Sequence, residues 1–537
     1  MMIRRSAIAV LCFSFAAAWA PLGAQQTDSA TGEAAEHGTL SSQEAQVFLQ
    51  AFQTISRYHA LAQEDSTLWE GAIEGLLENL NDPYASVFTP DEYGEFQEDN
   101  TGDYAGIGVQ ITHLGGRVTV TAVFRETPAE RVGMLVGDQI VWVEGVDATE
   151  WTTDDARDAI RGEPGSEVSL QVARQGFEEP IPMNIERDSV HVSAVATATL
   201  PGEIGHIALD RVARGSTEEM AEALVEFRDA RAVIIDLRRN PGGYLDEALQ
   251  ITDLFLPPGS TLASAEARSA DGELQSQSWQ ARTPMAAPDK PIVVLVDRFT
   301  ASAAEIVTGA LQDYGLAVVL GERSFGKGVV QTVYPLPAGR QLRITTGSWY
   351  TPLGRSLQRA RDRAGVPLPE DDLAAAVVTA TNGRELQSGG GIFPDLAVAD
   401  DTLKTEERGL LANAADAGVP MLIRLEEFTF DLAKAALDRG VVERLPASAF
   451  DPLAAQLIEE GMDPAVVNDP LARSYLDWRA QIRYLTRAEE RGLALEVQAE
   501  RDRVLAEALV LAGAARTPDD LFASVDGRVT APPGGAR

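Results

Sequence analysis

A serine that could act in covalent catalysis stands where a predicted strand meets a predicted helix. Ser302 follows the apolar run Ile292–Val296, and the alanines on either side leave its hydroxyl sterically open. A serine in such a turn can serve as a nucleophile, and the Ala303 amide at the start of the helix is then placed to bind an oxyanion. The alternative role is structural, because Ser302 and Glu305 have the spacing of a helix capping box.

A lysine that could activate this serine lies in the glycine-rich segment Gly321–Gln331. The segment is similar in sequence to a phosphate-binding P-loop. However, Gly328 stands where that loop needs Ser or Thr to hold magnesium, and the residues that follow are β-branched rather than helical in character. A nucleotide site is therefore not expected. If residues 327–331 are extended, Lys327 and Gln331 project from the same face, because strand side chains alternate. The glutamine amide oxygen could then hold the lysine amine in place.

A lysine base is the option that remains once the histidines are considered. The histidines are His37, His59, His113, His191 and His206. All precede the segments around Ser302, and none neighbours a candidate nucleophile or forms a metal-binding pair, so a Ser-His-Asp triad or a metal-ion mechanism is unsupported. His206 could still reach the site through folding. Lowering the pKa of a lysine from about 10.4 to near 7 by burial costs about 4–5 kcal/mol, which a site walled by Phe325 and apolar strands could supply.

A third polar segment ends another predicted strand. Residues Asp236–Gly243 close with Pro241-Gly242-Gly243. Two glycines let a backbone lie close to a ligand and can aim N–H groups at an anion. Glycine in a strand-to-helix turn is also often needed for steric reasons alone, so this pattern carries weight only together with Ser302 and Lys327.

These three segments lie within residues 203–350, which alternate apolar strand runs with helical segments and so indicate an α/β domain. The predicted strands and helices are Val233–Leu237, Leu245–Phe255, Ile292–Val296, Ala303–Leu311 and Leu316–Leu320. Before them, residues 104–176 resemble a PDZ domain, with a glycine-bounded strand at Gly106-Ile107-Gly108-Val109-Gln110-Ile111 and a short helix at Asp154–Ile160. Helical spacing of apolar residues predicts helices in 41–80 and in 404–525.

Together the segments 236–243, 299–306 and 321–331, with the PDZ-like unit and Asp82-Pro83-Tyr84, resemble the S41 family of C-terminal processing (tail-specific) peptidases. The resemblance covers residues 45–396 approximately, and it implies a multidomain α/β (α+β) protein with a core of the S41 (ClpP/crotonase-like) fold. The nucleophile turn departs from many relatives at Thr300 and Ala304, where they carry serines, and residues 361–389 have the character of an insertion.

The resemblance also assigns roles to individual residues. It implies that Ser302 is the nucleophile, Lys327 the general base and Gln331 the residue that orients the lysine. It further implies oxyanion donors and a peptide-binding site: the donors are Gly242, Gly243 and Ala303, and the peptide-binding residues are Gly106, Ile107, Gly108, Val109 and Arg161. The arginine would link peptide binding to activation. No metal and no cofactor are implied.

The N-terminus and the charge set the expected surroundings. Arg4 and Arg5 precede an apolar run and the small residues at Gly23 and Ala24, a pattern typical of a secretory signal peptide. Cys12, the only cysteine, lies inside that run, so the mature protein should contain no thiol, which excludes disulfides and cysteine nucleophiles. With 45 basic and 81 acidic residues and a net charge of −36, nucleic acid and anionic lipid are unfavourable partners.

The chain therefore divides into seven predicted parts. They are a signal peptide at 1–24, a linker at 25–40, a helical N-terminal domain at 41–95, a PDZ domain at 96–180, the S41 peptidase core at 181–400, a helical C-terminal region at 401–530 and a disordered tail at 531–537. The C-terminal region is expected to support the enzyme or to form a homo-oligomer. A periplasmic or secreted location is expected, with an uncleaved N-terminal anchor as the alternative.

The function predicted from these features is that of a serine endopeptidase that recognises protein C-termini through its PDZ domain and cleaves upstream of them. Its expected partners are proteins or peptides with apolar free C-termini, and a regulatory adaptor protein. The alternative is a PDZ-based binding or chaperone module that has lost catalysis. The joint presence of Ser302, Lys327 and Gln331 favours the enzyme.

Overall fold

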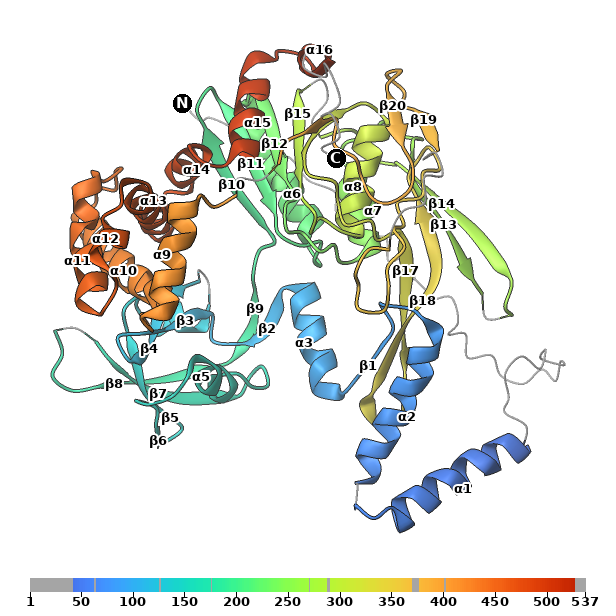
Figure 1. The fold of residues 1–537 in the computed structure, drawn as a ribbon, viewed down its shortest axis with the longest axis horizontal. Coiled ribbons are helices and arrows are strands. Elements are labelled where there is room, and N and C mark those ends of the chain that lie inside the picture. Colours follow the sequence, from blue (N-terminus) through green and yellow to red (C-terminus); the bar gives the residue numbers. More distant parts are fainter. Residues whose placement is uncertain are drawn as a thin grey trace, which may run out of the picture.

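The protein is described by a computed structural model. The residues described are 42–61, 64–124, 127–174, 176–269, 271–286, 290–368, 376–399 and 402–526. The predicted signal peptide, linker and C-terminal tail lie outside these residues. The predicted fold class is confirmed, because the described chain forms a multidomain α/β protein in which a mainly parallel sheet is flanked by helices (Figure 1).

The central sheet has the strand order β10-β11-β12-β15-β16-β21. Its strands are β10 (Val195–Leu200), β11 (Ile204–Leu209), β12 (Ala232–Asp236), β15 (Ile292–Val296), β16 (Ala317–Gly321) and β21 (Leu396–Ala397). Only β10 is antiparallel to its neighbour, and the other pairs are parallel. The β-branched runs of the sequence thus became strands buried on both faces, as parallel sheets require.

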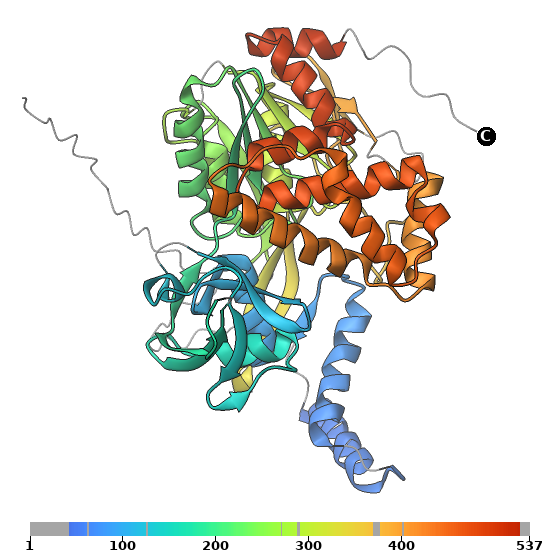
Figure 2. The same ribbon diagram turned by 90° about the vertical axis from the view of Figure 1, so that its left-hand side faces the viewer.

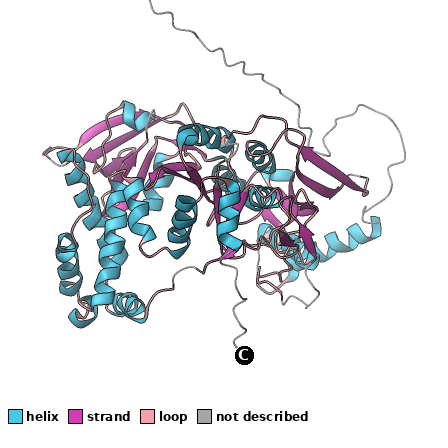
Figure 3. Ribbon diagram, turned by 90° about the horizontal axis from the view of Figure 1, so that it is seen from above, coloured by secondary structure: helices cyan, strands magenta, loops and turns pink. Residues whose placement is uncertain are grey.

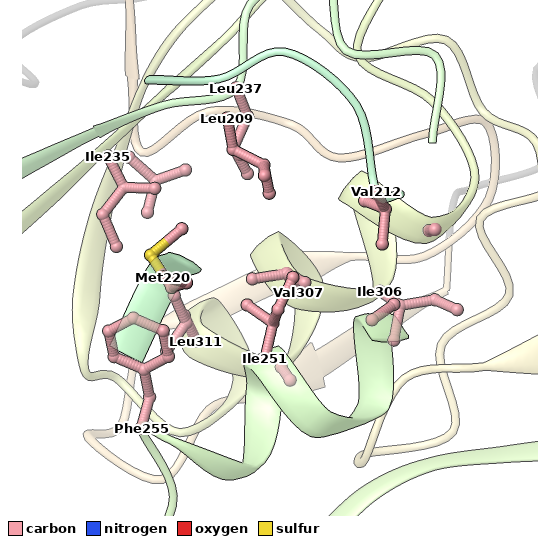
Figure 4. Packing of buried hydrophobic residues seen from close by; sticks show 14 of the residues in the cluster. Leu209, Val212, Met220, Ile235, Leu237, Ile251, Phe255, Ile306, Val307 and Leu311 are labelled. Carbon is pink, nitrogen blue, oxygen red and sulfur yellow. The ribbon is translucent and has the colours of Figure 1, made fainter. Parts of the chain in front are cut away.

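Helices cover both faces of this sheet. On one face lie α6 (Ser216–Glu226), α7 (Leu245–Asp253) and α8 (Ala303–Asp313), and on the other lie α15 (Arg503–Ala514) and α16 (Pro518–Asp526). Strand residues alternate between the two cores: Ile235 faces the first and Ile234 the second. Figure 4 shows Met220, Ile251 and Val307, from α6, α7 and α8, gathered in the first core.

The parallel arrangement of the strands places the three polar segments close together. The carboxyl ends of neighbouring parallel strands meet at one edge of a sheet, where α/β proteins bind their ligands. Strand β12 leads into the glycine turn, β15 into the serine turn and β16 into the lysine segment. The three polar segments singled out in the sequence therefore emerge at the same edge.

A second, antiparallel sheet carries the residues after Lys327. It consists of β1 (Ser86–Phe88), β13 (Thr261–Arg268), β14 (Leu274–Gln280), β17 (Val329–Pro335) and β18 (Gln341–Tyr350). Strand β18 pairs with β1, β13 and β17. Strand β1, from the N-terminal part of the chain, is thereby joined to β18. The segment predicted as an insertion contributes a hairpin of β19 (Val377–Thr379) and β20 (Glu385–Gln387).

The PDZ-like unit is a small sheet with its own core. Its elements are β3 (Val109–Leu114), β4 (Arg117–Val123), α4 (Pro128–Arg131), β5 (Gln139–Val143), β6 (Val146–Asp147), α5 (Thr153–Ile160), β7 (Glu167–Ala173) and β8 (Ile181–Glu186). The single strand predicted over residues 106–111 is instead broken. Strand β2 (Asp103–Gly106) ends at Gly106 and pairs with β9 (Asp188–His191), and β3 begins at Val109, because Gly108 takes a left-handed φ of 84°.

Helices lie at both ends of the described chain. Helix α1 (Ser42–Tyr58) projects away from the remainder in two views (Figures 1 and 2), whereas α2 (Asp65–Leu80) is joined to the second sheet by an ion pair between Glu70 and Arg340, the residue before β18. Helix α3 (Pro90–Thr101) leads to the PDZ-like unit. The helices α9 (Thr405–Asp416), α10 (Met421–Arg439), α11 (Asp451–Glu459), α12 (Pro464–Val467), α13 (Pro470–Arg487) and α14 (Arg491–Ala499) gather at one side (Figures 1 and 3). Within the described residues, every helix is too short or too polar to cross a membrane.

Candidate active site

The turn before α8 holds Ser302 in a backbone conformation that residues other than glycine rarely adopt. Its φ and ψ are 53° and −117°, and strain of this kind costs about 1–3 kcal/mol and persists only where the surroundings impose it. The Asp297 carboxylate helps to impose it, because its Oδ1 accepts hydrogen bonds from the amides of Phe299 and Thr300, at 3.0 Å each. The turn thus presents Ser302 between β15 and α8.

Gly242 lies directly against the serine turn. Its φ is 94°. A Cβ atom at this position would come within 2.8 Å of the Ala303 nitrogen and 2.9 Å of the Ser302 Cβ. Only glycine fits without moving the turn, so the predicted close approach of the Pro-Gly-Gly backbone to Ser302 is present.

The three predicted oxyanion donors differ in their availability. The Gly242 amide donates to Asn240 Oδ1 at 2.8 Å. The amides of Gly243 and Ala303 donate to no acceptor among the residues that the structure describes. In this conformation the free donors are therefore Gly243 and Ala303.

The fully buried Glu305 carboxylate joins the serine turn to the lysine segment. Its Oε2 accepts hydrogen bonds from the amides of Ser302 and Lys327, both at 2.8 Å. Its Oε1 accepts from the Gly326 amide at 2.8 Å and from the Ser324 hydroxyl at 2.5 Å. Burial raises the pKa of Glu305, and these hydrogen bonds oppose the rise. Both segments are tied to one carboxylate.

The Lys327 side chain is held by a short chain of hydrogen bonds. Its Nζ donates to Gln331 Oε1 at 2.6 Å, and Gln331 Nε2 donates to the carbonyl oxygen of Tyr84 at 3.0 Å. The Nζ also lies 5.0 Å from the centroid of the Tyr84 ring. Lys327 precedes β17, and a register shift lies between Val330 and Gln331. The lysine and glutamine therefore meet through an irregular segment rather than through regular strand alternation.

The environment of Lys327 favours its neutral form. Its pKa is lowered to about 8, chiefly by burial and also by the Arg343 guanidinium. The carboxylates of Asp82 and Glu305 act in the opposite direction without reversing the shift. A lysine in this state is partly neutral near pH 8, which is the property that a general base needs.

A cavity of about 710 Å³ opens beside these groups. Its lining residues are Tyr84, Arg239, Pro241, Arg298, Phe299, Ala301, Phe325 and Lys327. Ala301, which precedes Ser302 in the chain, and Lys327 both line this cavity. No hydrogen bond joins Lys327 Nζ to the Ser302 hydroxyl in the part of the chain that the structure describes, and the two residues are linked through the Glu305 carboxylate.

The residues predicted to bind a peptide lie in the PDZ-like unit. Gly106 closes β2, Ile107 is buried in the core of the unit, and Gly108 and Val109 lead into β3. The Tyr104 ring packs against this loop, because a Cβ atom at Gly106 would lie 2.8 Å from Tyr104 Cε2. Burial raises the pKa of the Tyr104 hydroxyl, and the positive charge of the nearby Arg161 guanidinium opposes this rise.

Arg161 lies at the end of α5 rather than in the active-site cavity. Its guanidinium pairs with Glu98 of α3 at 2.5 Å and lies 5.2 Å from the centroid of the Tyr104 ring. Arg161 therefore connects Tyr104, beside the loop predicted to bind a peptide, with the helix α3 that leads to the PDZ-like unit. It does not line the cavity beside Ser302.

His206 does not reach the site. It lies in β11, almost fully buried, with its Nε2 3.5 Å from Asp236 Oδ2. It is not among the residues that line the cavity. Within the described residues no cluster of three or more His, Cys, Asp or Glu side chains could hold a metal ion.

Two residues of the site had no assigned role in the sequence. The sequence suggests only a helix-capping role for Glu305, because it stands three residues after Ser302. That spacing is also the one sequence feature that points to its contact with the Ser302 amide. Tyr84 belongs to the Asp82-Pro83-Tyr84 turn, but nothing local shows that its carbonyl meets Gln331. Both contacts depend on packing between distant segments.

Comparison with known proteins identifies the family. Residues 203–366 match peptidase family S41, residues 119–174 match a PDZ domain, and residues 11–92 match the N-terminal domain of the activating protease CtpB. A carboxy-terminal-processing protease of Bartonella bacilliformis is 33% identical over 313 residues, which are 57% of this chain and 71% of that protein. The chain belongs to the carboxy-terminal-processing proteases of family S41. It is a serine-type peptidase.

Two further relatives by sequence agree with the assignment. The carboxy-terminal processing protease CtpA of Bacillus subtilis is 30% identical over 58% of this chain and 66% of its own length, and a probable CtpA-like serine protease of Staphylococcus epidermidis is 31% identical over 56% and 61%. The chain thus spans somewhat less than two thirds of these two relatives. The structure of a photosystem II D1 C-terminal processing protease is similar with a TM-score of 0.33 and 24% identity, covering 62% of this chain and 93% of that one.

Replacing Glu305 with glutamine should weaken both the fold and the activity of the protease. Each carboxylate oxygen accepts from an amide, so the NH₂ group of glutamine would face an N–H donor whichever way it is turned. We expect a loss of about 1–3 kcal/mol of stability, measured as a lower midpoint of denaturant unfolding, together with reduced turnover. Glu218→Gln, on the exposed side of α6, is the matched control and should change neither. An unchanged midpoint and turnover in Glu305→Gln would contradict the linking role.

Proposed function

We propose that this protease is an endopeptidase in which Ser302 is the nucleophile, Lys327 the general base and Gln331 the residue that positions the lysine. The observation that supports this most is the state of Lys327. It is a buried lysine with a pKa of about 8, held by Gln331, and its backbone shares a carboxylate oxygen with the strained serine turn. Strain and a perturbed pKa in one place are typical of a catalytic centre.

In the proposed reaction, neutral Lys327 accepts the Ser302 proton as Oγ attacks a substrate carbonyl. The amides of Ala303 and Gly243 stabilise the oxyanion, aided by the amino end of α8. The lysine then donates its proton to the leaving amine, and water hydrolyses the acyl-enzyme by the same route in reverse. Catalysis requires Lys327 Nζ to come within hydrogen-bond distance of Ser302 Oγ, a contact that often tightens only with substrate bound.

We further propose that the PDZ-like unit binds the free C-terminus of a substrate. The amides of Gly108 and Val109 would donate to the terminal carboxylate, while the peptide adds to the edge of the domain as a strand. Arg161 would transmit occupancy through Glu98 on α3. The physiological role proposed is processing or degradation of exported proteins, assisted by an adaptor protein and by homo-oligomerisation through the C-terminal helices.

Removal of either member of the dyad should abolish cleavage. Ser302→Ala and Lys327→Ala should each lower kcat by about 1,000-fold or more, because nucleophile and base act as one unit. Lys327→Arg should be as inactive as Lys327→Ala, since an arginine cannot be deprotonated in a protein. Turnover of an unfolded protein substrate provides the measurement, and circular dichroism checks the fold. Lys404→Ala, at an exposed lysine, is the control, and turnover by Lys327→Arg would remove the lysine from its role.

Activity should depend on pH through the lysine. Because Lys327 must be neutral and its pKa is lowered to about 8, kcat/KM should rise with pH and level off above pH 8. A profile measured on one peptide would show a rising limb centred near the pKa. His206→Gln should keep this limb, since His206 lies outside the cavity. Loss of the limb in that variant would assign the base to histidine.

Peptides with a free apolar C-terminus should be preferred. A peptide ending in Val-Ala should be cut about tenfold faster than its amidated twin, because a charge-assisted hydrogen bond to the carboxylate would be lost. Arg161→Ala should erase most of this preference, and Arg157→Ala, on the same helix and exposed, should retain it. Equal rates for the free and amidated peptides would exclude capture by the carboxylate and leave the dyad in place.

A further inference from the structure

Two guanidinium groups without an ion pair line the cavity beside Ser302. Arg239 and Arg298 both contribute to its wall, and neither forms an ion pair with any described residue. Arg298 lies over the Phe299 ring at 5.0 Å. The neighbouring Arg238, by contrast, is bound by two carboxylates at 2.7 Å each. The chain as a whole carries 81 acidic and 45 basic residues, so this cavity differs in charge from the molecule as a whole.

The backbone at both arginines is held by one buried carboxylate, that of Asp297. Asp297 Oδ1 accepts from the Arg239 amide at 3.0 Å, and also from the Phe299 amide, which follows Arg298 directly, at 3.0 Å. Arg239 is held with a φ of 63°, a left-handed conformation that costs free energy outside glycine. The Asp297 carboxylate is occupied by backbone amides and forms no ion pair with either guanidinium. It therefore holds the backbone that carries the two arginines, and both guanidinium groups are left without an ion pair to it.

The cavity suits a short apolar stem that ends in an anion. Its remaining walls near the serine turn are apolar, namely Pro241, Ala301 and Phe325. No acidic side chain lines it among the described residues. An arginine fork matches a carboxylate in two parallel hydrogen bonds. In a peptidase, an aspartate or glutamate side chain of the substrate has this chemistry.

We propose that Arg239 and Arg298 form a subsite for an acidic side chain close to the scissile bond. The inference rests on the proposed function, since it assumes cleavage at Ser302. The substrate would then be recognised at two places. The PDZ-like unit would bind its apolar C-terminus, and the cavity beside Ser302 would bind an aspartate or glutamate side chain upstream of that terminus. The subsite also offsets locally the repulsion that a net charge of −36 exerts on an acidic segment.

A set of matched peptides tests this subsite. All carry the same free Val-Ala end, and a single Glu, Gln or Lys is placed in turn at each position from the third residue before the cleaved bond to the third residue after it. At one or more positions the Glu peptide should show a kcat/KM about tenfold above its Gln twin, as expected for a charged hydrogen bond, with the Lys peptide lowest. Raising NaCl from about 0.05 to 0.5 M should shrink the ratio.

Variants connect the preference to the two arginines. In Arg239→Gln/Arg298→Gln the Glu-to-Gln ratio should fall to about one to two, whereas Arg239→Lys/Arg298→Lys should keep part of it, because charge remains without the fork. Arg228→Gln is the control, at a surface arginine paired with Asp229, and should keep the full ratio. Mass spectrometry verifies the cleaved bond, and circular dichroism verifies folding.

The outcomes distinguish the two levels of the proposal. Equal kcat/KM for the Glu and Gln peptides at every position, with Ser302→Ala inactive, would overturn the subsite and leave the proposed function intact. A preference that survives in the double glutamine variant would also overturn it, because the preference would then arise elsewhere. Cleavage by Ser302→Ala at the wild-type rate would overturn the proposed function, and the subsite with it.

Discussion

The Glu305 carboxylate lies at the centre of the site, shielded from solvent, and accepts hydrogen bonds from the backbone of both Ser302 and Lys327. These residues leave neighbouring parallel strands, so their separation depends on how two loops are held rather than on the strands themselves. An acceptor with four donors holds the loops more firmly than apolar packing alone, since leaving a buried amide unpaired costs about 1–3 kcal/mol. The precision of the site therefore depends on one residue of α8.

The same site requires a part of the chain that lies far from the peptidase core in sequence. The Tyr84 carbonyl accepts from Gln331, which in turn accepts from Lys327, and Asp82 of the same turn accepts from the Thr345 amide at 3.1 Å. Strand β1 continues this junction by pairing with β18. The position of the lysine amine is thus sensitive to the docking of the N-terminal segment, which leads through α3 to the PDZ-like unit and its Arg161–Glu98 pair.

Charge is distributed unevenly over this protease. The molecule is strongly anionic, yet Lys327 has Arg343 close enough to lower its pKa, and Arg239 and Arg298 line the same cavity. The nearby carboxylates of Asp297 and Glu305 are engaged by backbone amides. Positive charge in this cavity favours the neutral form of the lysine and also attracts anions, so the proposed base and the proposed acidic subsite would depend on the same local electrostatic field.

Features that depend on local patterns could be predicted from the amino-acid sequence. The alternation of apolar runs predicted the α/β core, and the turn residues around Ser302 and Lys327 predicted where chemistry would be placed, because periodicity and turn chemistry act over a few residues. The contacts that these segments make depend on the folded arrangement of distant parts of the chain. The Tyr84 contact with Gln331 spans 247 residues and the Arg239 contact with Asp297 spans 58, and the pKa of Lys327 follows from burial by segments that no local pattern brings together.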